Sequence, residues 1–471
     1  MTKKLTSIPI LVLFIFTLSC RSLFEIQQNI EDNRLFTTAT QYPSKTDTET
    51  PITPTLTNTK NPPSATSTKI PTLTHTAKPT NTATLRPTPS SEQEQVFKEL
   101  WSAINENYLY PDFNGLDWNE IHNEFEERIK LGLTKKEFYE AMHELVYALG
   151  DDHSAFFDPG EVAEADAELN GEYSYVGIGV LGIVQEGKEH LSVISTFPNS
   201  PAEKAGILPH DRVIEVNGEP VVDKNGIRYE LLSGEVESVI KIKLLTPNNE
   251  VKEISLKREE LSGNLPVPYF KSETNAGKSI GYIMLTSFRY TSIYENVLSI
   301  LSELSSDKQL DGLIIDNRFN RGGSSDVLTN VLSLFINGNA GYFIQQKAER
   351  LFTIKGENFF GSQYVPLVIL IGPDTASFGE IFSGVLKDLD RAYLIGENSE
   401  GNVEVLHIFD FSDGSRAWIA KETFQPLFNP DLNWENIGVT PHLILESDWD
   451  EFTTQNDPLI NSALQYFDGI D

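Results

Sequence analysis

Residues 365–380 read VPLVILIGPDTASFGE, an apolar run that passes directly into a polar turn. A short apolar run rich in β-branched residues is typical of a strand that is buried on both faces of a sheet. A second run, GLIID at residues 312–316, has the same character and is followed by NRFNRGG. Chemistry in an α/β fold gathers where such strands end, so these two turns are the candidate functional site.

Around these two strands the sequence alternates between strand-like and helix-like segments. SIGYIML at residues 279–285 and the apolar residues 392–395 are expected strands, and residues 294–304 and 380–389 are expected amphipathic helices. A β-α-β alternation with apolar strands predicts a mainly parallel α/β core over residues 263–471.

Ser377 lies in the first of these turns, just before a sequence that favours a helix. A hydroxyl group in a strand-to-helix turn is exposed, and the N–H groups behind it can stabilise an oxyanion. Gly322 and Gly323 in the other turn allow a close backbone approach and could supply a second donor. A serine at a helix start is also a common N-cap, so the turn alone leaves both roles open.

The two segments upstream of the core have different patterns. Residues 93–170 contain VFKELWSAINENYLY and FYEAMHELVYALG, in which apolar residues recur every three or four positions, so this segment is expected to be helical. Residues 171–262 contain short β-rich runs separated by Gly, Pro and Asn turns, as in a small β domain.

Part of the β-rich segment carries a more specific signal. SPAEKAGI at residues 200–207, followed by VNG at residues 216–218, resembles the short helix, strand and turn of a PDZ domain. The upstream positions that match the carboxylate-binding loop of such domains are Gly177, Ile178, Gly179 and Val180. Glycines let successive N–H groups converge on a terminal carboxylate, and the following strand can pair with an extended peptide. The alternative is a β domain whose glycine turn binds nothing.

Residues 1–20 have the pattern of an export signal. Lys3 and Lys4 precede an apolar stretch over residues 8–18, which is too short to span a bilayer and fits a signal peptide. The segment resembles a bacterial lipoprotein signal, in which Cys20 would be the lipidated first residue of the mature chain, although Thr17 stands where that motif usually has Leu. The alternative is an ordinary secretory signal with an incidental cysteine. Both interpretations predict export.

Residues 21–92 are dominated by Thr, Pro, Ser and Asn and contain few apolar side chains to bury. Such a composition predicts a disordered linker, which proline biases toward an extended stalk. Residues 1–90 contain 9 Lys or Arg and 5 Asp or Glu, whereas the rest of the chain contains 28 and 63. This acidic body argues against non-specific nucleic-acid binding and against electrostatic docking on anionic lipid. Membrane contact is therefore expected only through the lipid anchor.

The cysteine content also limits the chemistry. Cys20 is the single cysteine of the chain, which excludes an intrachain disulfide framework and any multi-cysteine zinc or iron–sulfur site. The sequence contains no metal-ligand cluster and no nucleotide-binding loop, so no metal and no cofactor are expected.

Six motifs occur along the chain in the order LGDDHSAFFDP, the PDZ-like segment, GYIMLTSF, LDGLIIDNRFNRGG, TASFGE and ENIGVTP. Together they resemble the serine peptidase family that contains the carboxyl-terminal processing proteases and the tricorn core proteases. The resemblance covers residues 93–446 and implies an α/β, crotonase-like (ClpP/crotonase-type) catalytic core with an N-terminal helical segment and an inserted PDZ domain. It also implies that Ser377 is the nucleophile and that Gly322 or Gly323, with the amide of Phe378, forms the oxyanion hole.

The family divides by the way in which the serine is activated. Processing proteases use a lysine 25 residues after the serine and a glutamine four residues later, but this chain has Asn402 and Leu406 at those positions. Tricorn-type members use a histidine ahead of the PDZ domain and a distant glutamate, which correspond here to His153 and Glu435. Asp152 stands where the tricorn pattern has a serine, and its carboxylate could still orient the histidine ring.

The resemblance therefore implies an exported serine endopeptidase on the outer face of the membrane, which recognises the C-terminal ends of protein or peptide substrates through its PDZ domain. A neutral histidine would take the serine proton and a carboxylate would fix its tautomer. Because lysine-type members carry the same His segment without using it as the base, a structural role for His153 is the alternative. A second class of function is a catalytically inactive peptide-binding relative, which the loss of the Lys/Gln pair favours. An acyl-CoA enzyme, a third class for crotonase-like cores, is disfavoured by export.

Overall fold

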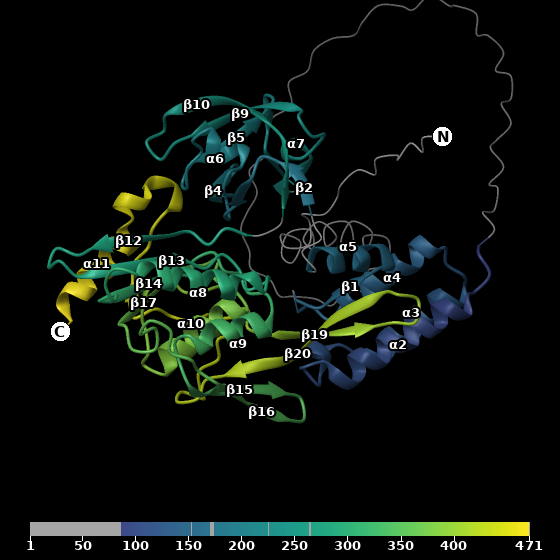
Figure 1. Cartoon of the computed structure of the whole chain (residues 1–471). Helices are drawn as coiled ribbons and strands as arrows, with labels where there is room; N and C mark the ends of the chain where they lie inside the picture. The colour runs from purple at the N-terminus through teal and green to yellow at the C-terminus, as the bar shows by residue number, and fades with distance from the viewer. Residues whose placement is uncertain (1–85, 152, 170–173, 225, 263–264, 471) are drawn as a thin grey trace, which may run out of the picture.

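The computed structural model describes residues 86–151, 153–169, 174–224, 226–262 and 265–470. Within these ranges the chain forms an N-terminal helical segment, a β-rich unit and an α/β core (Figure 1). The predicted signal with Cys20, nearly all of the predicted linker, and Asp152 lie outside the described residues. No helix in the described ranges combines the length and the apolar character needed to span a membrane.

The core is built around a six-stranded sheet in the order β12-β13-β14-β17-β18-β21. Its strands are β12 (Tyr269–Glu273), β13 (Ser279–Met284), β14 (Gly312–Asp316), β17 (Leu367–Ile371), β18 (Tyr393–Gly396) and β21 (Leu443–Ile444). Neighbouring strands are parallel except for β12, which is antiparallel to β13. Every residue of β14 and β17 is buried, which explains the two continuous apolar runs in the sequence. The prediction of a mainly parallel α/β core is confirmed.

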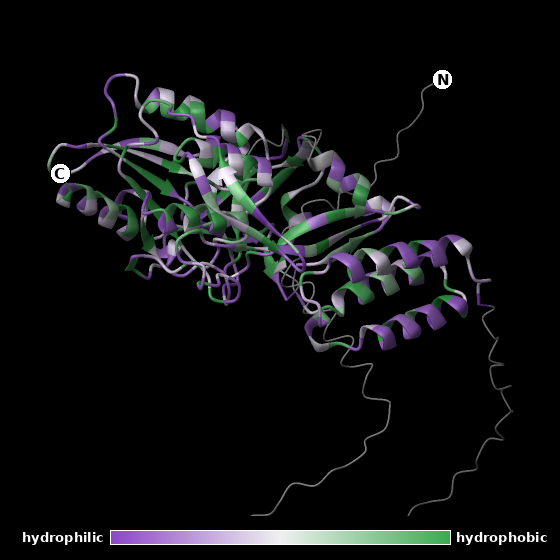
Figure 2. Cartoon of the chain, turned by 90° about the horizontal axis from the view of Figure 1, so that it is seen from below, coloured by the Kyte–Doolittle hydropathy of each residue, from purple (hydrophilic) through white to green (hydrophobic). Residues whose placement is uncertain are grey.

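Helices cover both faces of this sheet. The helices α8 (Ser292–Leu304), α9 (Ser325–Ser333) and α10 (Phe378–Asp388) pack on one face, and α11 (Pro458–Gly469) packs on the other. Successive strand residues point to opposite faces, so Ile315 lies in the cluster with α10 whereas Ile314 lies in the cluster with α11. Figure 2 shows hydrophobic residues concentrated on the central strands and hydrophilic residues on the outer helical faces.

A second sheet, which the sequence pattern did not predict, joins the core to the helical segment. Its antiparallel strands are β1 (Ala155–Phe157), β15 (Gly338–Gln345), β16 (Glu349–Ile354), β19 (Val405–Asp410) and β20 (Arg416–Gln425), in the order β1-β20-β15-β16 with β19 paired to β20. The helical segment contains α2 (Ser91–Asn107), η1 (Phe113–Gly115), α3 (Trp118–Lys130), α4 (Lys135–Tyr147) and α5 (Pro159–Leu169). Ala417 and Ile419 of β20 share a buried cluster with α2, α3 and α4, so this sheet fixes the helices against the core.

The β-rich unit has a five-strand path in the order β10-β9-β5-β4-β3, with β3 at its edge. The main elements are β2 (Ser174–Gly177), β3 (Val180–Ile183), β4 (Leu191–Thr196), α6 (Pro201–Lys204), β5 (Arg212–Val216), α7 (Tyr229–Leu232), β9 (Val239–Leu245), β10 (Val251–Lys257) and β11 (Glu259–Ser262). The short strands are β6 (Glu219–Pro220), β7 (Val222–Asp223) and β8 (Gly226–Ile227). The hydroxyl of Ser200 accepts the N–H of Glu203 and begins α6, as the PDZ-like motif predicts.

The β-rich unit docks on the core through a short helical turn, η2 (Trp449–Glu451), near the C-terminus. The indole N–H of Trp449 donates to the Val193 carbonyl at 3.0 Å, and the ring stacks on His210 at 3.7 Å between centroids. The Asp450 carboxylate accepts the hydroxyl of Ser192 at 2.7 Å. The two units thus share a buried contact with specific polar partners.

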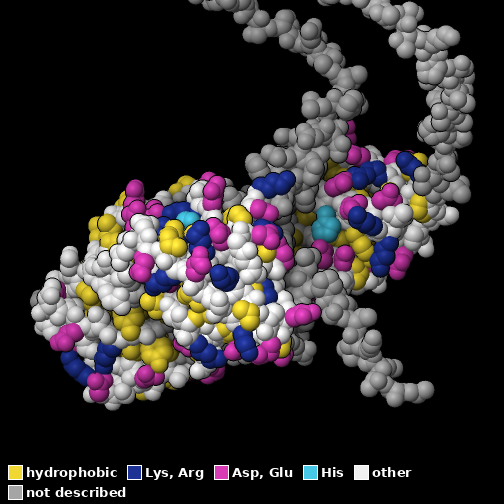
Figure 3. Space-filling model, turned by 90° about the horizontal axis from the view of Figure 1, so that it is seen from above, with side chains coloured by type: hydrophobic (Ala, Val, Ile, Leu, Met, Phe, Trp, Pro, Cys, Tyr) yellow, Lys and Arg dark blue, Asp and Glu magenta, His cyan; other side chains and the backbone are white. Residues whose placement is uncertain are grey.

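A buried ion triad lies directly beneath this contact. The Arg318 guanidinium, which follows β14, donates at 2.6 Å to both Asp316 and Asp457, and it lies 5.0 Å from the centre of the Trp449 ring. The side chains of all three charged residues are at most 7 % exposed. On the face of the molecule shown in Figure 3, by contrast, acidic and basic side chains are interspersed at the surface.

Replacement of Arg318 should be strongly destabilising, because Arg318→Leu leaves two buried carboxylates without their cation. We expect a loss of about 3–5 kcal/mol in the free energy of unfolding, measured by chemical denaturation. The control is Arg128→Leu, which removes a partly exposed ion pair with Glu144 and should cost within about 1 kcal/mol. Equal losses in the two variants would contradict the importance of the buried triad.

Candidate active site

Ser377 lies where the chain leaves β17 and enters α10, and its backbone is strained. Its φ of 53° and ψ of −127° are uncommon for a residue with a side chain. The N–H of Ser377 donates to the Asn402 carbonyl at 2.7 Å and to the Glu380 carboxylate at 3.1 Å. A serine in a strained strand-to-helix turn has the geometry of a nucleophile elbow, which exposes the hydroxyl at the helix N-terminus.

The glycine turn after β14 packs directly against this serine. A Cβ atom on Gly322 would lie 3.0 Å from the Ser377 hydroxyl oxygen and 2.8 Å from the Phe378 nitrogen. The φ of Gly322 is 83°, so both the space and the backbone conformation require glycine at this position.

Two N–H groups beside the serine are open to an oxyanion. The parallel bridge between Phe288 and Gly323 uses the Gly322 carbonyl and the Ser324 N–H, so the N–H of Gly323 points away from residue 288. The N–H of Gly322 donates instead to the side chain of Asn320 at 3.0 Å. Among the described residues no acceptor is found for the N–H of Gly323 or of Phe378, which favours Gly323 over Gly322 as the second donor.

Glu380, which the sequence reasoning did not single out, organises the loops around the serine. Its fully buried carboxylate accepts the hydroxyl of Ser399 at 2.6 Å and the N–H groups of Gly401 and Asn402 at 2.8 Å, in addition to that of Ser377. Burial raises the pKa of Glu380 to about 7. A glutamate three residues after a serine N-cap is a capping-box pattern, so the sequence did contain a signal for this residue.

His153 lies in a tight turn just ahead of β1. The Asp151 carboxylate accepts the N–H and the hydroxyl of Ser154, both at 2.7 Å, and the N–H of His153 at 3.2 Å. The Ser154 hydroxyl in turn accepts the N–H of Ala420 at 3.0 Å, which ties the turn to β20. The His153 side chain is 11 % exposed, so the turn holds the ring in a largely enclosed position.

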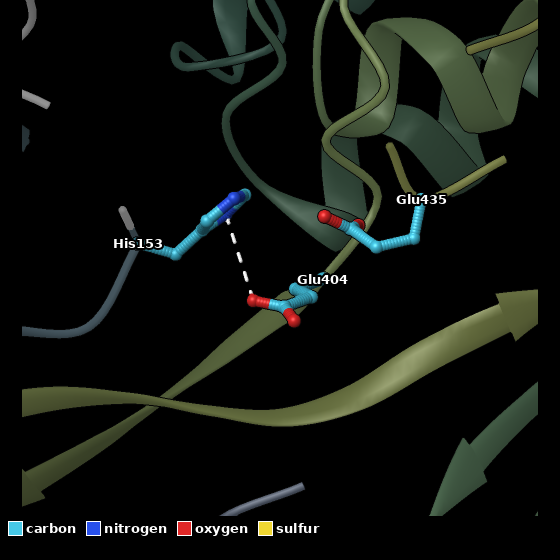
Figure 4. Close-up of side chains that lie close together, drawn as sticks. All are labelled: His153, Glu404 and Glu435. Atoms are coloured by element: carbon cyan, nitrogen blue, oxygen red, sulfur yellow. Dashed lines mark ion pairs between the residues drawn. The ribbon is translucent and has the colours of Figure 1, made fainter. Parts of the chain in front are cut away.

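Two glutamates lie beside His153, and the sequence identified only one of them. Figure 4 shows Glu404 and Glu435 with their carboxylates directed toward the imidazole ring. The Glu404 carboxylate lies 4.0 Å from Nδ1 of His153, its side chain is 3 % exposed, and it accepts the hydroxyl of Tyr110. Glu435 accepts the N–H of Val403 at 2.8 Å. Burial raises the pKa of Glu435, although that hydrogen bond and the nearby His153 oppose the rise.

A run of three consecutive residues connects the serine to this histidine cluster. Asn402 holds the Ser377 backbone, Val403 binds Glu435, and Glu404 faces His153. Consecutive Cα atoms are about 3.8 Å apart, so the cluster and the serine occupy the same small region. Within the described part of the chain the Ser377 hydroxyl and the His153 ring do not form a hydrogen bond with each other, and such catalytic bonds are often long before substrate binds.

His153, Glu404 and Glu435 are also the residues that could hold a metal ion, since their candidate ligand atoms lie within 4.8 Å of one another. Tetrahedral zinc with bonds of about 2.0–2.2 Å places its ligand atoms about 3.3 Å apart. The 4.0 Å between Nδ1 and the Glu404 oxygen is wider, so the cluster would have to contract around zinc. As it stands, the arrangement fits a histidine base between two carboxylates better.

The PDZ-like loop lies at the start of the edge strand of its sheet. Gly177 ends β2, and Val180 begins β3. Ile178 is buried in the core of the unit, and Gly179 has a φ of 78° with its Cα packed against the Ser200 side chain. The geometry leaves the outer edge of β3 as the place where a peptide strand could pair.

Comparisons with known proteins agree with this architecture. The family model "Peptidase family S41" matches residues 279–445, "Tricorn protease C1 domain" matches residues 89–147, and "PDZ domain" matches residues 197–246. A carboxyl-terminal-processing protease of Synechocystis sp. is 26 % identical over 396 residues, which cover 81 % of this chain and 89 % of that protein. The carboxy-terminal processing protease CtpB of Bacillus subtilis is 27 % identical over 333 residues, which cover 69 % of this chain and 66 % of that protein.

Solved structures give the same result. The photosystem II D1 C-terminal processing protease matches with a TM-score of 0.55 and 26 % identity over 76 % of this chain and 94 % of that one. A protein described as an S41 protease from Bacteroides fragilis matches with a TM-score of 0.51 over 79 % of this chain and 97 % of that one. Because its sequence is 16 % identical, this match supports the fold alone.

Fold and comparisons together define a serine-type peptidase with an α/β core, an N-terminal helical segment and a PDZ domain. Residues 279–445 match peptidase family S41, and the chain is similar to carboxyl-terminal processing proteases over most of its length. The family resemblance, the fold class and the enzyme class inferred from the sequence are confirmed.

The stability contributed by Glu380 should depend on pH in a defined direction. Its pKa is near 4.5 in the unfolded chain and about 7 when folded, so the folded protein binds more protons between these values. The free energy of unfolding of the wild type relative to Glu380→Gln should therefore fall as the pH rises from about 4.5 to about 7 and stay level above, as measured by chemical denaturation.

Glu422 provides the matched control for this experiment. It is also buried, but hydrogen bonds with His407 and Gln345 overcome the effect of burial and lower its pKa to about 2. The difference in the free energy of unfolding between the wild type and Glu422→Gln should be constant between pH 4.5 and 7. It should fall only below that range. If this difference depended on pH in the same way for both variants, the Glu380 carboxyl would not be the source of the pH dependence.

Proposed function

We propose that this protein is an exported serine endopeptidase, tethered to the outer face of the membrane, that cleaves peptide bonds in protein or peptide substrates. The observation that supports it most is the strained turn at Ser377, which faces the N–H groups of Gly323 and Phe378. A serine hydroxyl beside N–H groups that have no acceptor is the combination that acyl transfer requires.

In the proposed mechanism His153 is the general base. The neutral imidazole takes the proton of the Ser377 hydroxyl while its oxygen bonds to the scissile carbonyl carbon, and the oxyanion accepts the N–H groups of Gly323 and Phe378. The imidazolium then gives its proton to the leaving amine as the peptide bond breaks. Water hydrolyses the resulting ester with His153 again as base, which regenerates the serine.

Glu435 is the carboxylate that the tricorn pattern proposes beside the base. Asp152 stands where that pattern has a serine, and it would be a further carboxylate able to orient the ring. A lysine mechanism is not available as aligned, because Asn402 has no basic side chain and contributes its backbone carbonyl to Ser377. The loss of that lysine, and of the glutamine replaced by Leu406, favours the second candidate, a peptide-binding relative without activity. We favour the enzyme because the nucleophile turn and the histidine cluster are retained together.

Substrate recognition is proposed to use the PDZ domain. The loop from Gly177 to Val180, including Ile178 and Gly179, would bind the terminal carboxylate of a substrate, and β3 would pair with the residues before it. The relatives named as carboxyl-terminal processing proteases support this assignment. Lipidation at Cys20, with residues 21–92 as a stalk, would hold the peptidase at the membrane.

The decisive test is covalent labelling with a fluorophosphonate probe, together with cleavage of a peptide library. We expect the wild type to be labelled and Ser377→Ala to be silent, because only an activated serine reacts. His153→Ala should reduce labelling by at least about 100-fold. Absence of both labelling and cleavage in the wild type would favour the inactive alternative, and full activity of His153→Ala together with a gain in Asn402→Lys would refute His153 as base.

Recognition of the C-terminus predicts a preference for a free carboxylate. A substrate peptide with a C-terminal amide should have a lower kcat/KM than the same peptide with a free acid, by roughly 10-fold or more, because the loop loses a charged acceptor. Matched peptides that differ only at this group provide the measurement. Equal kcat/KM values for the two peptides would show that the PDZ domain does not recognise the C-terminal carboxylate of the substrate.

A further inference from the structure

Two carboxylates flank one histidine, although a serine triad needs only one. We propose that Glu404 is the carboxylate that orients His153, and that Tyr110 from the helical segment holds Glu404 in place. The proposal rests on the proposed function, because it assigns positioning roles in the same reaction. Neither residue is in the family pattern that the sequence shows, since Glu404 lies in GNVEVL and Tyr110 follows the first helix.

The first step is that Glu435 is engaged with the backbone. Its carboxylate accepts the N–H of Val403 at 2.8 Å, and the N–H of Glu404 also stabilises its charge. These contacts fix the run of residues 402–404, which holds the Ser377 backbone through Asn402. Glu435 therefore acts on the shape of the loop and on the local charge.

The second step is that the two carboxylate oxygens of Glu404 lie next to different groups. Oε1 accepts the Tyr110 hydroxyl, and Oε2 lies 4.0 Å from Nδ1 of His153. Hydrogen bonds of this kind are about 2.8 Å long, so a side-chain shift of roughly 1 Å completes the contact when the ring becomes an imidazolium. With Nδ1 turned to Glu404, Nε2 remains for the serine proton, which is the tautomer that a base requires.

The third step is that Tyr110 is itself fixed as a donor. Burial and the hydrogen bond to Glu404 raise the pKa of Tyr110 well above its usual value, so its hydroxyl keeps its proton. Its ring makes an edge contact with Tyr108, which is fully buried and accepts a hydrogen bond from Asn114. A stack of Tyr108, Phe113 and Trp118 continues into the helical segment. The helical segment thus supplies part of the catalytic machinery.

The carboxylates around His153 allow the proposed role of Glu404 to be measured as a change in the pH dependence of activity. Among the described residues, Glu404 and Glu435 lie beside the His153 ring, and Asp151 accepts the backbone N–H of His153. Tyr108 and Tyr110 interact with these carboxylates. A carboxylate next to an imidazole favours its protonated form, so removing one should move the protonation of the base to lower pH. A residue with only a structural role would lower activity without moving the pH profile.

The test compares Glu404→Gln, Glu404→Asp, Tyr110→Phe and Glu435→Gln by steady-state peptide hydrolysis and by the rate of Ser377 labelling, across pH 5–9 in the full chain. We expect Glu404→Gln to lower kcat by at least about 100-fold, with KM within about threefold, and to shift the acid limb of the profile down by about one pH unit. Compared with Glu404→Gln, Glu404→Asp should recover part of kcat, and the acid limb of its pH profile should lie where it does in the wild type. Tyr110→Phe should lower kcat by roughly 10-fold, because Glu404 loses the hydroxyl that holds it.

Glu422→Gln is the matched control, because Glu422 is a buried glutamate that pairs with a histidine, His407, in the same sheet, and neither residue belongs to the His153 cluster. It should leave kcat and the pH profile unchanged. If Glu404→Gln does not fold, Glu404→Asp and Tyr110→Phe decide in its place, and each should lower kcat while KM stays within about threefold of the wild type. An unchanged pH profile in Glu404→Gln, or an unchanged kcat in both other variants, together with a shift in Glu435→Gln, would overturn the proposal. Failure of the proposed function is distinct, because the wild type itself would then show no labelling that depends on Ser377.

Discussion

The strained backbone at Ser377 is the feature on which the rest of the site depends. A residue with a side chain at a φ of 53° costs about 1–3 kcal/mol, and it persists only if the surroundings hold it there. The Asn402 carbonyl and the Glu380 carboxylate hold its N–H, and Gly322 closes the other side. The conformation that exposes the nucleophile is therefore maintained by three separate parts of the chain.

One consequence is that the turn at Ser377 does not depend on which side chain residue 402 carries. Asn402 keeps the backbone contact to Ser377 whatever its side chain is, so the loop can preserve the elbow while its side-chain chemistry changes. Two residues further on, Glu404 is already directed at His153. The same short run therefore contacts Ser377 through its backbone and faces His153 with a side chain.

The sequence predicted those parts of the fold that local patterns encode. The apolar runs of β14 and β17, the short helix after Ser200 and the strand-to-helix turn at Ser377 each follow from adjacent residues. The second sheet was missed because β20 carries the charged residues Arg416, Lys421 and Glu422, and Glu422 becomes buried only when β20 pairs with distant strands. Glu404 was missed for the same reason: its partner Tyr110 is 294 positions away, and a glutamate before a strand otherwise indicates an exposed side chain.

The PDZ domain and the glycine turn after β14 are connected through the same short segment of chain. Arg318 stands between β14 and the glycine turn, is bound by Asp316 and Asp457, and lies against Trp449, which binds the PDZ strand β4. Moving the PDZ domain away from the core would expose this ion triad on one side and lose the indole hydrogen bond. The position of the domain and the shape of the turn that precedes Gly323 are therefore stabilised by the same buried contacts.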